Sequence, residues 1–356
     1  MRAPLTASPT ELDSIPDVPA VFLLWAGQGK PYLARTALLR RRLKRLISDR
    51  GRVSKLLSLR GIVERIEYWA TGSALASSLL HLELARAHFP DDWERITRLR
   101  HPAFVRLSLD NMFPRTNIAT RFGKGLFFGP FPSRAAAERF DAGMLDLFQI
   151  RRCEENLTPT PEHPGCIYGE MARCLRPCQS VVTIEEYRSE ASRVEHFLRT
   201  NGASLREPAE VARDRASSDM QFETADRMHQ QVEKIAAVQA LAGELARSVD
   251  RLSGVAVVRA PRPGAVDLLF LLGGRWQDAV RFSPGEAGAS MDRRLRELAA
   301  TLPPGGPANL EHLAILTRWH GSSWREGEWL SFDSIEKIPY RKLVNAIGRV
   351  QGGKTE

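Results

Sequence analysis

The sequence has no apolar run long enough to cross a membrane and no secretory leader. A bilayer-spanning helix needs about 18–20 consecutive apolar residues, and no segment of the chain approaches that length. The first residues, MRAPLTASPTELDSIPD, also lack the apolar core of a secretory signal. We therefore expect a cytoplasmic protein without membrane contacts, and a disordered lead-in before the first domain.

The sequence also lacks internal repeats of about 20–50 residues, which excludes a solenoid architecture. At 356 residues the chain is too long for one ordinary core, so we expect about two to four domains. Its composition, 43% hydrophobic and 26% charged, is that of a globular protein. The alternation of short strands with helical segments predicts a multi-domain α/β fold.

Negative charge is scarce in one stretch of the chain. Residues 35–65 contain eleven Lys or Arg and two Asp or Glu, an excess of nine that equals the formal charge of +9 of the whole chain. The remainder is therefore balanced. A basic segment of this kind indicates binding to a polyanion such as nucleic acid, and we expect the contacts to come from Arg35, Arg40, Arg41, Arg42, Lys44 and Arg45.

The first hundred residues predict a small α/β domain. Residues 19–34 indicate two strands around the turn GQGKP, and residues 36–50 follow as a helix with leucines on one face. Residues 62–71 alternate like a strand, and residues 73–89 indicate a second helix that Pro90 ends. The order β-β-α-β-α places this domain at residues 14–100.

Four further segments follow. They are a β-rich connecting segment with a helix at 101–150, a four-cysteine segment at 151–180, a helical region at 181–245, and a mixed α/β domain at 246–356. The helical region includes two antiparallel helices at 206–245, within which a hairpin motif occupies 206–240. Trp319, Trp324 and Trp329 of the last domain are spaced by five residues. We expect them to pack in the core rather than to stack on bases.

Cysteine is absent everywhere except in a 26-residue window that holds Cys153, Cys166, Cys174 and Cys178. Disulfides are rare in the cytoplasm, whereas four thiolates complete a tetrahedral zinc site or hold an iron–sulfur cube. Only Cys174 and Cys178 have a spacing typical of zinc ligands. The residues alone therefore predict a metal site and leave zinc and iron–sulfur open. Arg152, Arg173 and Arg176 beside the cysteines would offset the thiolate charge.

The cysteine segment carries a resemblance to a known family. YGEMARCLRPC at 168–178, preceded by FFGPFPS at 127–133 and by Cys153, resembles the UvrC family, the incision nuclease subunit of bacterial nucleotide excision repair. DMQFETADRMHQQVEKI at 219–235 resembles that family's UVR motif, a helical hairpin. The domain at 14–100 is similar to a GIY-YIG nuclease module in length and element order. The resemblance implies that the four cysteines bind a 4Fe-4S cluster.

The resemblance also implies a protein partner. In the family the UVR hairpin pairs with a like hairpin on the damage-loading subunit, UvrB. The corresponding residues here are Phe222, Glu223, Ala225 and Met228. Phe222, Ala225 and Met228 begin an apolar stripe at helical spacing, which can pack against a partner or against the preceding helix. The sequence alone leaves both arrangements open.

The GIY-YIG resemblance assigns a role to four positions. In the family a first tyrosine helps to deprotonate water, a second tyrosine follows, a helix arginine stabilises charge on the phosphate, and a glutamate holds a divalent metal such as Mg²⁺. Counted onto this chain, these positions are Phe22, Tyr32, Arg42 and His81. Arg35 occupies a position where the family often has a lysine.

At two of these positions the residue lacks the functional group that the family uses there. Phe22 has no hydroxyl to exchange a proton, and His81 is a poor ligand for Mg²⁺, which prefers oxygen. Glu83 would project about 200° away from position 81 on a helix. No Asp/Asp/His set of the family's RNase H-like half is present in 246–356. We therefore expect a DNA-binding protein whose nuclease site is impaired.

Two other interpretations remain open at this point. The chain could be an active endonuclease that uses Tyr32, Arg42 and either His81 or Glu83 with a divalent metal. Alternatively, the four cysteines could stabilise a module that binds RNA or an acidic protein, because a basic helix does not distinguish between these partners. Nicking of DNA separates the first interpretation from ours, and salt-dependent binding to DNA separates the second.

Overall fold

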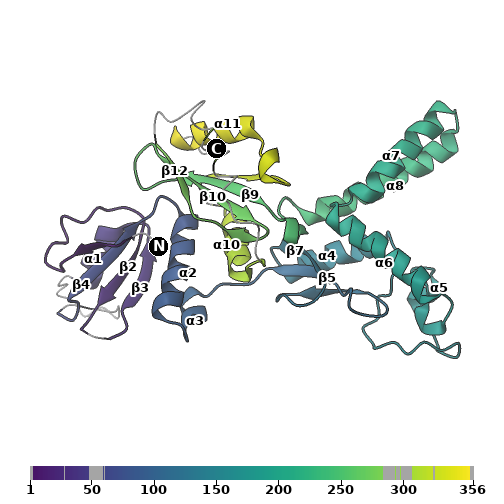
Figure 1. The fold of residues 1–356 in the computed structure, drawn as a ribbon, viewed down its shortest axis with the longest axis horizontal. Helices are drawn as coiled ribbons and strands as arrows, with labels where there is room; N and C mark the ends of the chain where they lie inside the picture. Colours follow the sequence, from purple (N-terminus) through teal and green to yellow (C-terminus); the bar gives the residue numbers. More distant parts are fainter. Residues whose placement is uncertain are drawn as a thin grey trace.

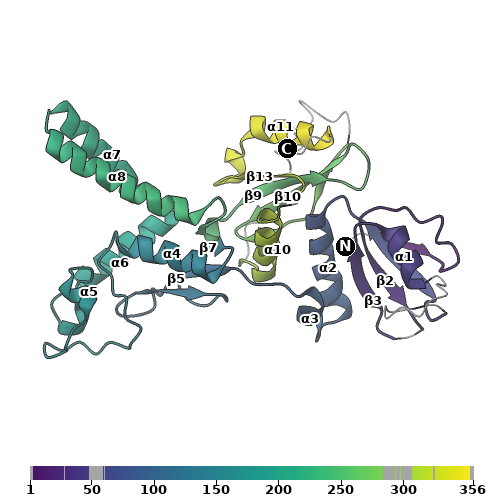
Figure 2. The same ribbon diagram turned by 180° about the vertical axis from the view of Figure 1, so that it is seen from behind.

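The computed structural model describes residues 3–27, 29–47, 59, 61–283, 293, 297, 307–323 and 325–352. The described residues form an elongated molecule with an N-terminal domain at one end, a C-terminal domain in the centre and a middle domain at the other end (Figure 1). A long helical hairpin projects from the middle domain (Figures 1 and 2). The prediction of a multi-domain α/β protein is confirmed.

The N-terminal domain is built on a four-stranded antiparallel sheet with the order β1-β4-β2-β3. The expected strands and helices are present. Ser73 begins the second helix by accepting a hydrogen bond from the amide of Ala76 at 3.1 Å. The elements are β1 (Leu5–Ala7), β2 (Ala20–Trp25), β3 (Tyr32–Thr36), α1 (Leu39–Ile47), β4 (Arg65–Ala70), α2 (Ala74–His88) and the short α3 (Trp93–Thr97).

The strand β1 corrects the prediction of a disordered lead-in and extends this domain before residue 14. Leu5, Thr6 and Ala7 pair with Tyr68, Glu67 and Ile66 at the edge of the sheet. Leu5 is 56% exposed and Ala7 alone of the strand packs against the apolar core, so the strand is held mainly by backbone pairing. A sequence pattern based on hydrophobic alternation therefore gives no signal for it.

Helices cover both faces of this sheet. Alternate residues of β2 point to opposite faces: Phe22 packs with Leu39 and Leu43 of α1, whereas Leu23 packs with Leu84 of α2. The sheet is thus a central layer between α1 and α2. This arrangement decides which of the predicted site residues can meet.

The middle domain contains a second four-stranded sheet, with the order β6-β5-β7-β8. Its helices start at clear capping residues: Ser133 accepts from the amide of Ala136, and Thr183 forms a capping box with Glu186. The elements are β5 (Ala103–Leu107), β6 (Thr116–Ala119), β7 (Leu126–Phe131), α4 (Arg134–Leu145), α5 (Ile167–Glu170), α6 (Ile184–Arg199) and β8 (Arg247–Ser248).

The hairpin consists of α7 (Ala203–Ser218) and α8 (Phe222–Ala242), as the sequence predicted. Its base joins the core of the middle domain, because Ile235 and Val238 of α8 are buried with residues of α4 and α6. Its other end projects away from the body (Figure 1). The hairpin is thus anchored at one end only.

The C-terminal domain is a five-stranded antiparallel sheet between two helices. Leu313 and Leu316 of α10 pack on one face, and Leu343 and Ile347 of α11 pack on the other. The elements are β9 (Gly254–Arg259), β10 (Val266–Leu272), β11 (Arg275–Trp276), β12 (Val280–Phe282), α10 (Leu310–His320), β13 (Glu328–Ser331) and α11 (Tyr340–Gln351).

The helix α2 joins the N-terminal domain to the C-terminal domain. One face packs on the N-terminal sheet, while Leu75 and Leu82 on another face belong to the apolar cluster of α10. Arg86 of α2 also forms an ion pair with Glu311 at 2.9 Å. Trp319 and Trp329 are buried in the same cluster, as expected for packing residues, and Trp324 lies outside the described residues.

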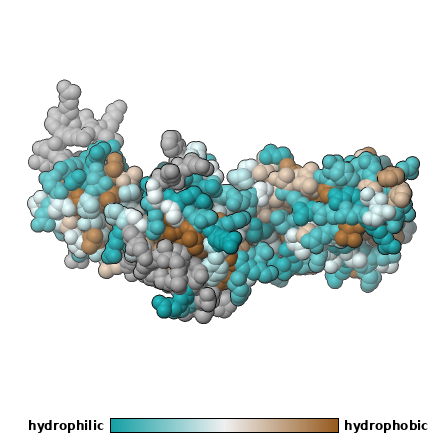
Figure 3. All heavy atoms as spheres, turned by 90° about the horizontal axis from the view of Figure 1, so that it is seen from above, coloured by the Kyte–Doolittle hydropathy of each residue, from teal (hydrophilic) through white to brown (hydrophobic). Residues whose placement is uncertain are grey.

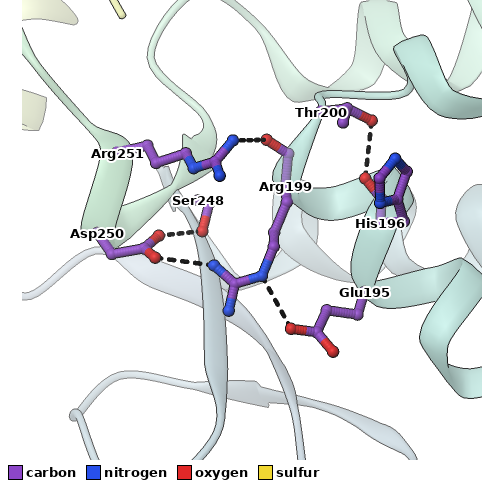
Figure 4. Close-up of polar contacts among 7 residues, drawn as sticks. All are labelled: Glu195, His196, Arg199, Thr200, Ser248, Asp250 and Arg251. Atoms are coloured by element: carbon purple, nitrogen blue, oxygen red, sulfur yellow. Dashed lines mark hydrogen bonds and ion pairs between the residues drawn. The ribbon is translucent and has the colours of Figure 1, made fainter. Parts of the chain in front are cut away.

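A polar network fixes the connection between the middle and C-terminal domains (Figure 4). Arg199 at the end of α6 donates to Glu195 at 2.8 Å and to Asp250 at 2.9 Å, and these two carboxylates raise the pKa of its guanidinium. Arg251 donates to the carbonyl oxygen of Arg199 at 3.4 Å. Hydrogen bonds from Ser248 and Arg199 lower the pKa of Asp250, although burial opposes this.

Hydrophilic residues dominate the surface seen from above, with apolar side chains in small separate groups (Figure 3). Among the helices of the described residues, none is both long enough and apolar enough to span a bilayer.

Candidate functional site

The first two predicted nuclease positions lie on the α1 face of the N-terminal sheet. Phe22 is fully buried, and its ring centre is 6.3 Å from that of the half-buried Tyr32. The backbone register explains the contact, because β2 and β3 are paired neighbours with Leu24 opposite Tyr32. Arg42 is half-buried on α1, the helix that covers this face.

His81 and Arg35 lie on the other face of the sheet. Arg35 follows Ala34 on β3 and so points away from the α1 face, where it donates a hydrogen bond to Ser78 of α2. His81 is on α2 beside it: burial and the charge of Arg35 lower the pKa of His81 to about 4. Strand alternation thus puts Phe22 and Tyr32 on one face of the sheet and Arg35, with His81 of α2 beside it, on the other.

Glu83 does not compensate for this separation. It is exposed on α2, and its pKa is raised by burial and, to a lesser extent, by the charge of Asp278 in the C-terminal domain. On an ideal helix, residues two apart project about 200° from each other, so position 83 faces away from position 81.

On α1, Arg41, Lys44 and Arg45 are exposed and Arg40 and Arg42 are half-buried, while the leucines of the helix are buried. Two aspartates before β2 partly neutralise them: Arg41 pairs with Asp17 at 3.0 Å, and Lys44 pairs with Asp13 and thereby lowers the pKa of that carboxyl. Because α1 covers one face of the sheet and Arg35 points to the other, Arg35 is separate from the basic surface of α1. That surface is formed by Arg40, Arg41, Arg42, Lys44 and Arg45. The basic residues between 48 and 58, and Arg60, lie outside the described residues.

The four cysteines lie close enough to influence one another. Burial raises the pKa of the Cys174 thiol to about 11, and the charges of Cys153, Cys166 and Cys178 contribute. Within the described ranges, however, no group of three or more His, Cys, Asp or Glu side chains is arranged so that it could hold a metal ion. A single tetrahedral zinc, with Zn–S bonds of ~2.3 Å, would place the sulfur atoms ~3.8 Å apart.

A buried arginine lies beside the cysteine cluster. Arg151 is 1% exposed and donates to the carbonyl oxygens of Phe113 at 3.0 Å and Glu155 at 2.7 Å. Its guanidinium also reaches the Cys153 sulfur at 3.9 Å. No ion pair with a carboxylate is present for Arg151 in the described part of the chain. A buried cation without a carboxylate fits a site that gains negative charge from thiolates.

Of the three arginines beside the cysteines, Arg176 donates its backbone N–H to the Cys174 sulfur at 3.4 Å, whereas the other two pair with a carboxylate. Arg152 and Arg173 both contact Asp146, at 2.8 and 2.9 Å, and Arg152 also lies over the ring of Tyr168. The sequence contained a signal for Arg151, because residues two apart on an extended chain share a face. Arg151 is two positions before Cys153, whereas Arg152 is one position before it.

The UVR-like residues become steadily more buried from the tip of the hairpin to its base. Phe222 is 71% exposed at the start of α8, and Glu223 is exposed. Ala225 and Met228 are half-buried where α8 packs against α7, and Ile235 is fully buried. The stripe is thus shared between the preceding helix and an open tip.

Comparison with known proteins agrees with this arrangement. Residues 103–197 match the family described as UvrC/Cho excinuclease, middle domain. This segment extends from β5 into α6 and includes all four cysteines.

Curated relatives match over a longer part of the chain. UvrABC system protein C of Lachnospira eligens is 26% identical over 227 residues, which are 61% of this chain and 36% of the relative. The proteins of the same name from Ectopseudomonas mendocina and Pseudomonas syringae pv. syringae are 27% and 28% identical, each over 71% of this chain and 42% of the relative. The chain spans about two-fifths of the length of the curated relatives that it matches, and no solved structure matches it. Residues 103–197 thus match the UvrC/Cho excinuclease middle-domain family, and the chain is similar to UvrABC system protein C over about two-thirds of its length.

Proposed function

We propose that the protein binds DNA in bacterial nucleotide excision repair and that its GIY-YIG-like nuclease site is impaired. The relationship to UvrC supports the process. The single observation that carries the loss of cutting is Phe22, which is fully buried at the position of the first tyrosine.

The remaining groups do not supply the missing chemistry. Removing a general base typically lowers a rate by ~10²–10⁴, and the neutral imidazole of His81 lies across the sheet from Tyr32. Imidazole is also a poor ligand for Mg²⁺. The domain is thus left with Arg42 and Tyr32 on one face, where the aspartates beside α1, Asp13 and Asp17, are paired with Lys44 and Arg41.

The basic surface on α1 supports binding to the DNA backbone. Phosphate contacts require cationic side chains but no catalytic group, and Arg40, Arg41 and Lys44 are held in place by Asp13 and Asp17. Such contacts bind without regard to sequence and weaken as salt rises. We infer that this helix attaches the N-terminal domain to DNA.

We further propose that Cys153, Cys166, Cys174 and Cys178 hold a 4Fe-4S cluster, with zinc as the alternative. The mutual influence of the thiols and the buried cation Arg151 support this assignment. When bound, the group would join the chain before α5 to the chain after it and so stabilise the segment between α4 and α6. Arg151 would remain buried as the counter-charge.

A protein partner at the hairpin completes the proposal. The exposed tip, with Phe222 and Glu223, offers an apolar and an acidic contact to a like hairpin of a UvrB-type subunit. The base of the hairpin is occupied by the core of the middle domain. The tip is therefore the part that we expect a partner to use.

Nicking of supercoiled plasmid DNA in the presence of Mg²⁺ or Mn²⁺ tests the loss of cutting. We expect the full chain to produce no nicked circles above the level of the Arg42→Ala variant. Nicking that requires Arg42 would show an active, rearranged site and would overturn the proposal.

DNA binding is tested by the salt dependence of affinity for a short duplex. For Arg41→Gln with Arg45→Gln we expect weaker binding and a salt slope reduced by about 0.9 for each lost phosphate contact. Arg227→Gln on α8, which is also exposed, is the matched control and should leave the slope unchanged. Equal slopes for all three proteins would contradict a DNA contact at α1.

Metal analysis of the anaerobically purified protein tests the cofactor. We expect a brown protein with about four iron atoms per chain, as the cluster type requires, and loss of iron in Cys178→Ser. Stoichiometric zinc would select the alternative, and absence of both metals would overturn the metal site.

A further inference from the structure

A cavity of about 440 Å³ lies where α2 and the end of β3 meet α10. The N-terminal domain contributes Arg35, Ser78 and His81, and the C-terminal domain contributes Arg318, Ile315 and Trp319. The basic surface of α1, to which we assign DNA binding, lies on the opposite face of the sheet and does not line this cavity.

Two arginines from different domains, Arg35 and Arg318, line the same cavity. Partial burial and, to a lesser extent, the charge of Arg318 lower the pKa of Arg35. In the part of the chain that the structure describes, neither forms an ion pair with a carboxylate. Two converging guanidinium groups are a typical binding arrangement for phosphate.

Neutral polar groups lie beside the arginine pair. The hydroxyl of Ser78 accepts from Arg35 and donates to the carbonyl oxygen of Ala74 at 2.8 Å, so it fixes the direction of the guanidinium. The imidazole of His81 is uncharged at neutral pH, since its pKa is lowered to about 4. An N–H of this ring can therefore donate to an anion, and the anion would in turn raise the pKa of the ring.

The cavity is larger than a free phosphate ion requires, and part of its wall is apolar. Leu82 and Ile315 are almost completely buried and, with Leu99, give the cavity an apolar side. The volume lies in the range of ~300–1,000 Å³ that is usual for sites of small organic ligands. Glu326 is exposed at the rim, where a carboxylate can accept hydrogen bonds from sugar hydroxyls.

We propose that this cavity binds an organic phosphate of nucleotide size, with its phosphoryl group between Arg35 and Arg318 and its uncharged part against Leu82, Leu99 and Ile315. The ligand is a free nucleotide or the phosphorylated end of a nucleic-acid strand, which share this chemistry. Because the arginines belong to two domains, the bound ligand would tie α2 to α10.

Isothermal titration calorimetry with the full chain tests the proposal. The probes are adenosine 5′-monophosphate, inorganic phosphate, and a thymidine tetranucleotide with and without a 5′-phosphate. The variants are Arg35→Gln and Arg318→Gln, with the exposed Arg341→Gln on α11 as the matched control. Circular dichroism establishes that the variants are folded, which we expect because both arginines are exposed.

We expect one of the two 5′-phosphorylated probes to bind at least tenfold more tightly than inorganic phosphate, and either arginine variant to lose at least tenfold in affinity. The monophosphate identifies a free nucleotide as the source, and selective binding of the phosphorylated tetranucleotide identifies a strand end. The pKa of His81, followed by NMR, should rise when the ligand binds. Binding of neither probe, or equal binding by the folded arginine variants, would overturn the site.

Discussion

Arg151 shows how a single residue can report on a site that the sequence only outlines. Its guanidinium is buried beside Cys153 and donates hydrogen bonds to carbonyl oxygens. Because carbonyl groups are neutral, these bonds do not balance the positive charge of the guanidinium. Leaving one member of a buried charge pair without its counterpart is costly. The charge of Arg151 therefore makes sense when the neighbouring thiols carry negative charge.

Replacing Arg151 tests this coupling at the residue scale. In the metal-loaded protein we expect Arg151→Met to lower the free energy of unfolding by about 3–5 kcal/mol, because a buried charge loses its partner. Arg173→Met is the control: this arginine is 46% exposed in its pair with Asp146, so its loss should cost about 1 kcal/mol or less. Urea unfolding before and after removal of the metal gives both values. Equal losses in the two variants would argue against a charge role for Arg151.

Asp141 on α4 gives a second prediction at this scale. Burial raises its pKa to about 6 against the opposing effects of Thr116 and Arg152, and its Oδ1 has no hydrogen-bond partner. The folded pKa exceeds the unfolded value, so the contribution to stability is present below about pH 4 and is lost as the pH rises through about 6.

Asp141→Asn should therefore stabilise the protein above pH 6 by about 1–3 kcal/mol and have little effect near pH 4. Thermal unfolding at both pH values measures the difference. Glu138→Gln, at an exposed ion pair one turn away, should show no comparable gain. A gain for Asp141→Asn that is the same at both pH values would exclude ionisation as the cause.

At the scale of the element, the hairpin changes character along its length. Both helices are regular, yet the side chains of α8 pass from exposed at Phe222 to fully buried at Ile235. Since truncating an exposed residue removes no packing, the two ends of one helix should respond differently to the same substitution.

We expect Phe222→Ala to leave the free energy of unfolding within ~0.5 kcal/mol of the parent and Ile235→Ala to lower it by about 2–5 kcal/mol. In contrast, Phe222→Ala should weaken binding to a UvrB-type subunit, because an exposed aromatic residue is a typical interface anchor. Chemical denaturation and a pull-down with that subunit separate the effects. A large loss of stability in Phe222→Ala would mean that the tip packs within the protein.

The elements that the sequence predicted are those with a strong local pattern. The leucine face of α1 and the β-forming run of β2 both depend on neighbouring residues. The strands β1 and β8 gave no such signal, because three and two residues are held there by pairing with a distant strand. The separation of His81 from Tyr32 could not be read from the sequence either, since it depends on which face of the sheet α2 covers.

At the scale of the whole molecule, α2 and α10 unite the outer domain with the central one. Two histidines lie at this contact: burial, with the charges of nearby arginines, lowers the pKa of His312 to about 4, and the pKa of His81 is lowered to a similar value. His312 also accepts a hydrogen bond from the amide of Trp276 at 2.9 Å. Both rings are therefore neutral in the folded protein at neutral pH.

A folded pKa below the unfolded value gives stability that is present above about pH 6.5 and is lost as the pH falls toward about 4. We expect acidification over this range to weaken the contact of the two domains by about 1–3 kcal/mol in total. His312→Asn, which keeps an acceptor for Trp276, should reduce the pH dependence. His229→Gln on the exposed face of α8 should not. Urea unfolding between pH 4 and 7 measures the slope, and an unchanged slope in His312→Asn would contradict the assignment.

The length of the hairpin has a consequence for assembly. The helix α8 contains 21 residues, and at 1.5 Å per residue it extends about 32 Å. Its free end therefore lies well away from its buried end in the middle domain. If a partner subunit binds at this end, it would lie about 32 Å from the root of the hairpin, which is the length of roughly nine base pairs of duplex DNA at ~3.4 Å per pair. The number of helical turns would then set the distance between the partner and the base of the hairpin. Removing one turn from each helix would shorten this distance by ~5.4 Å.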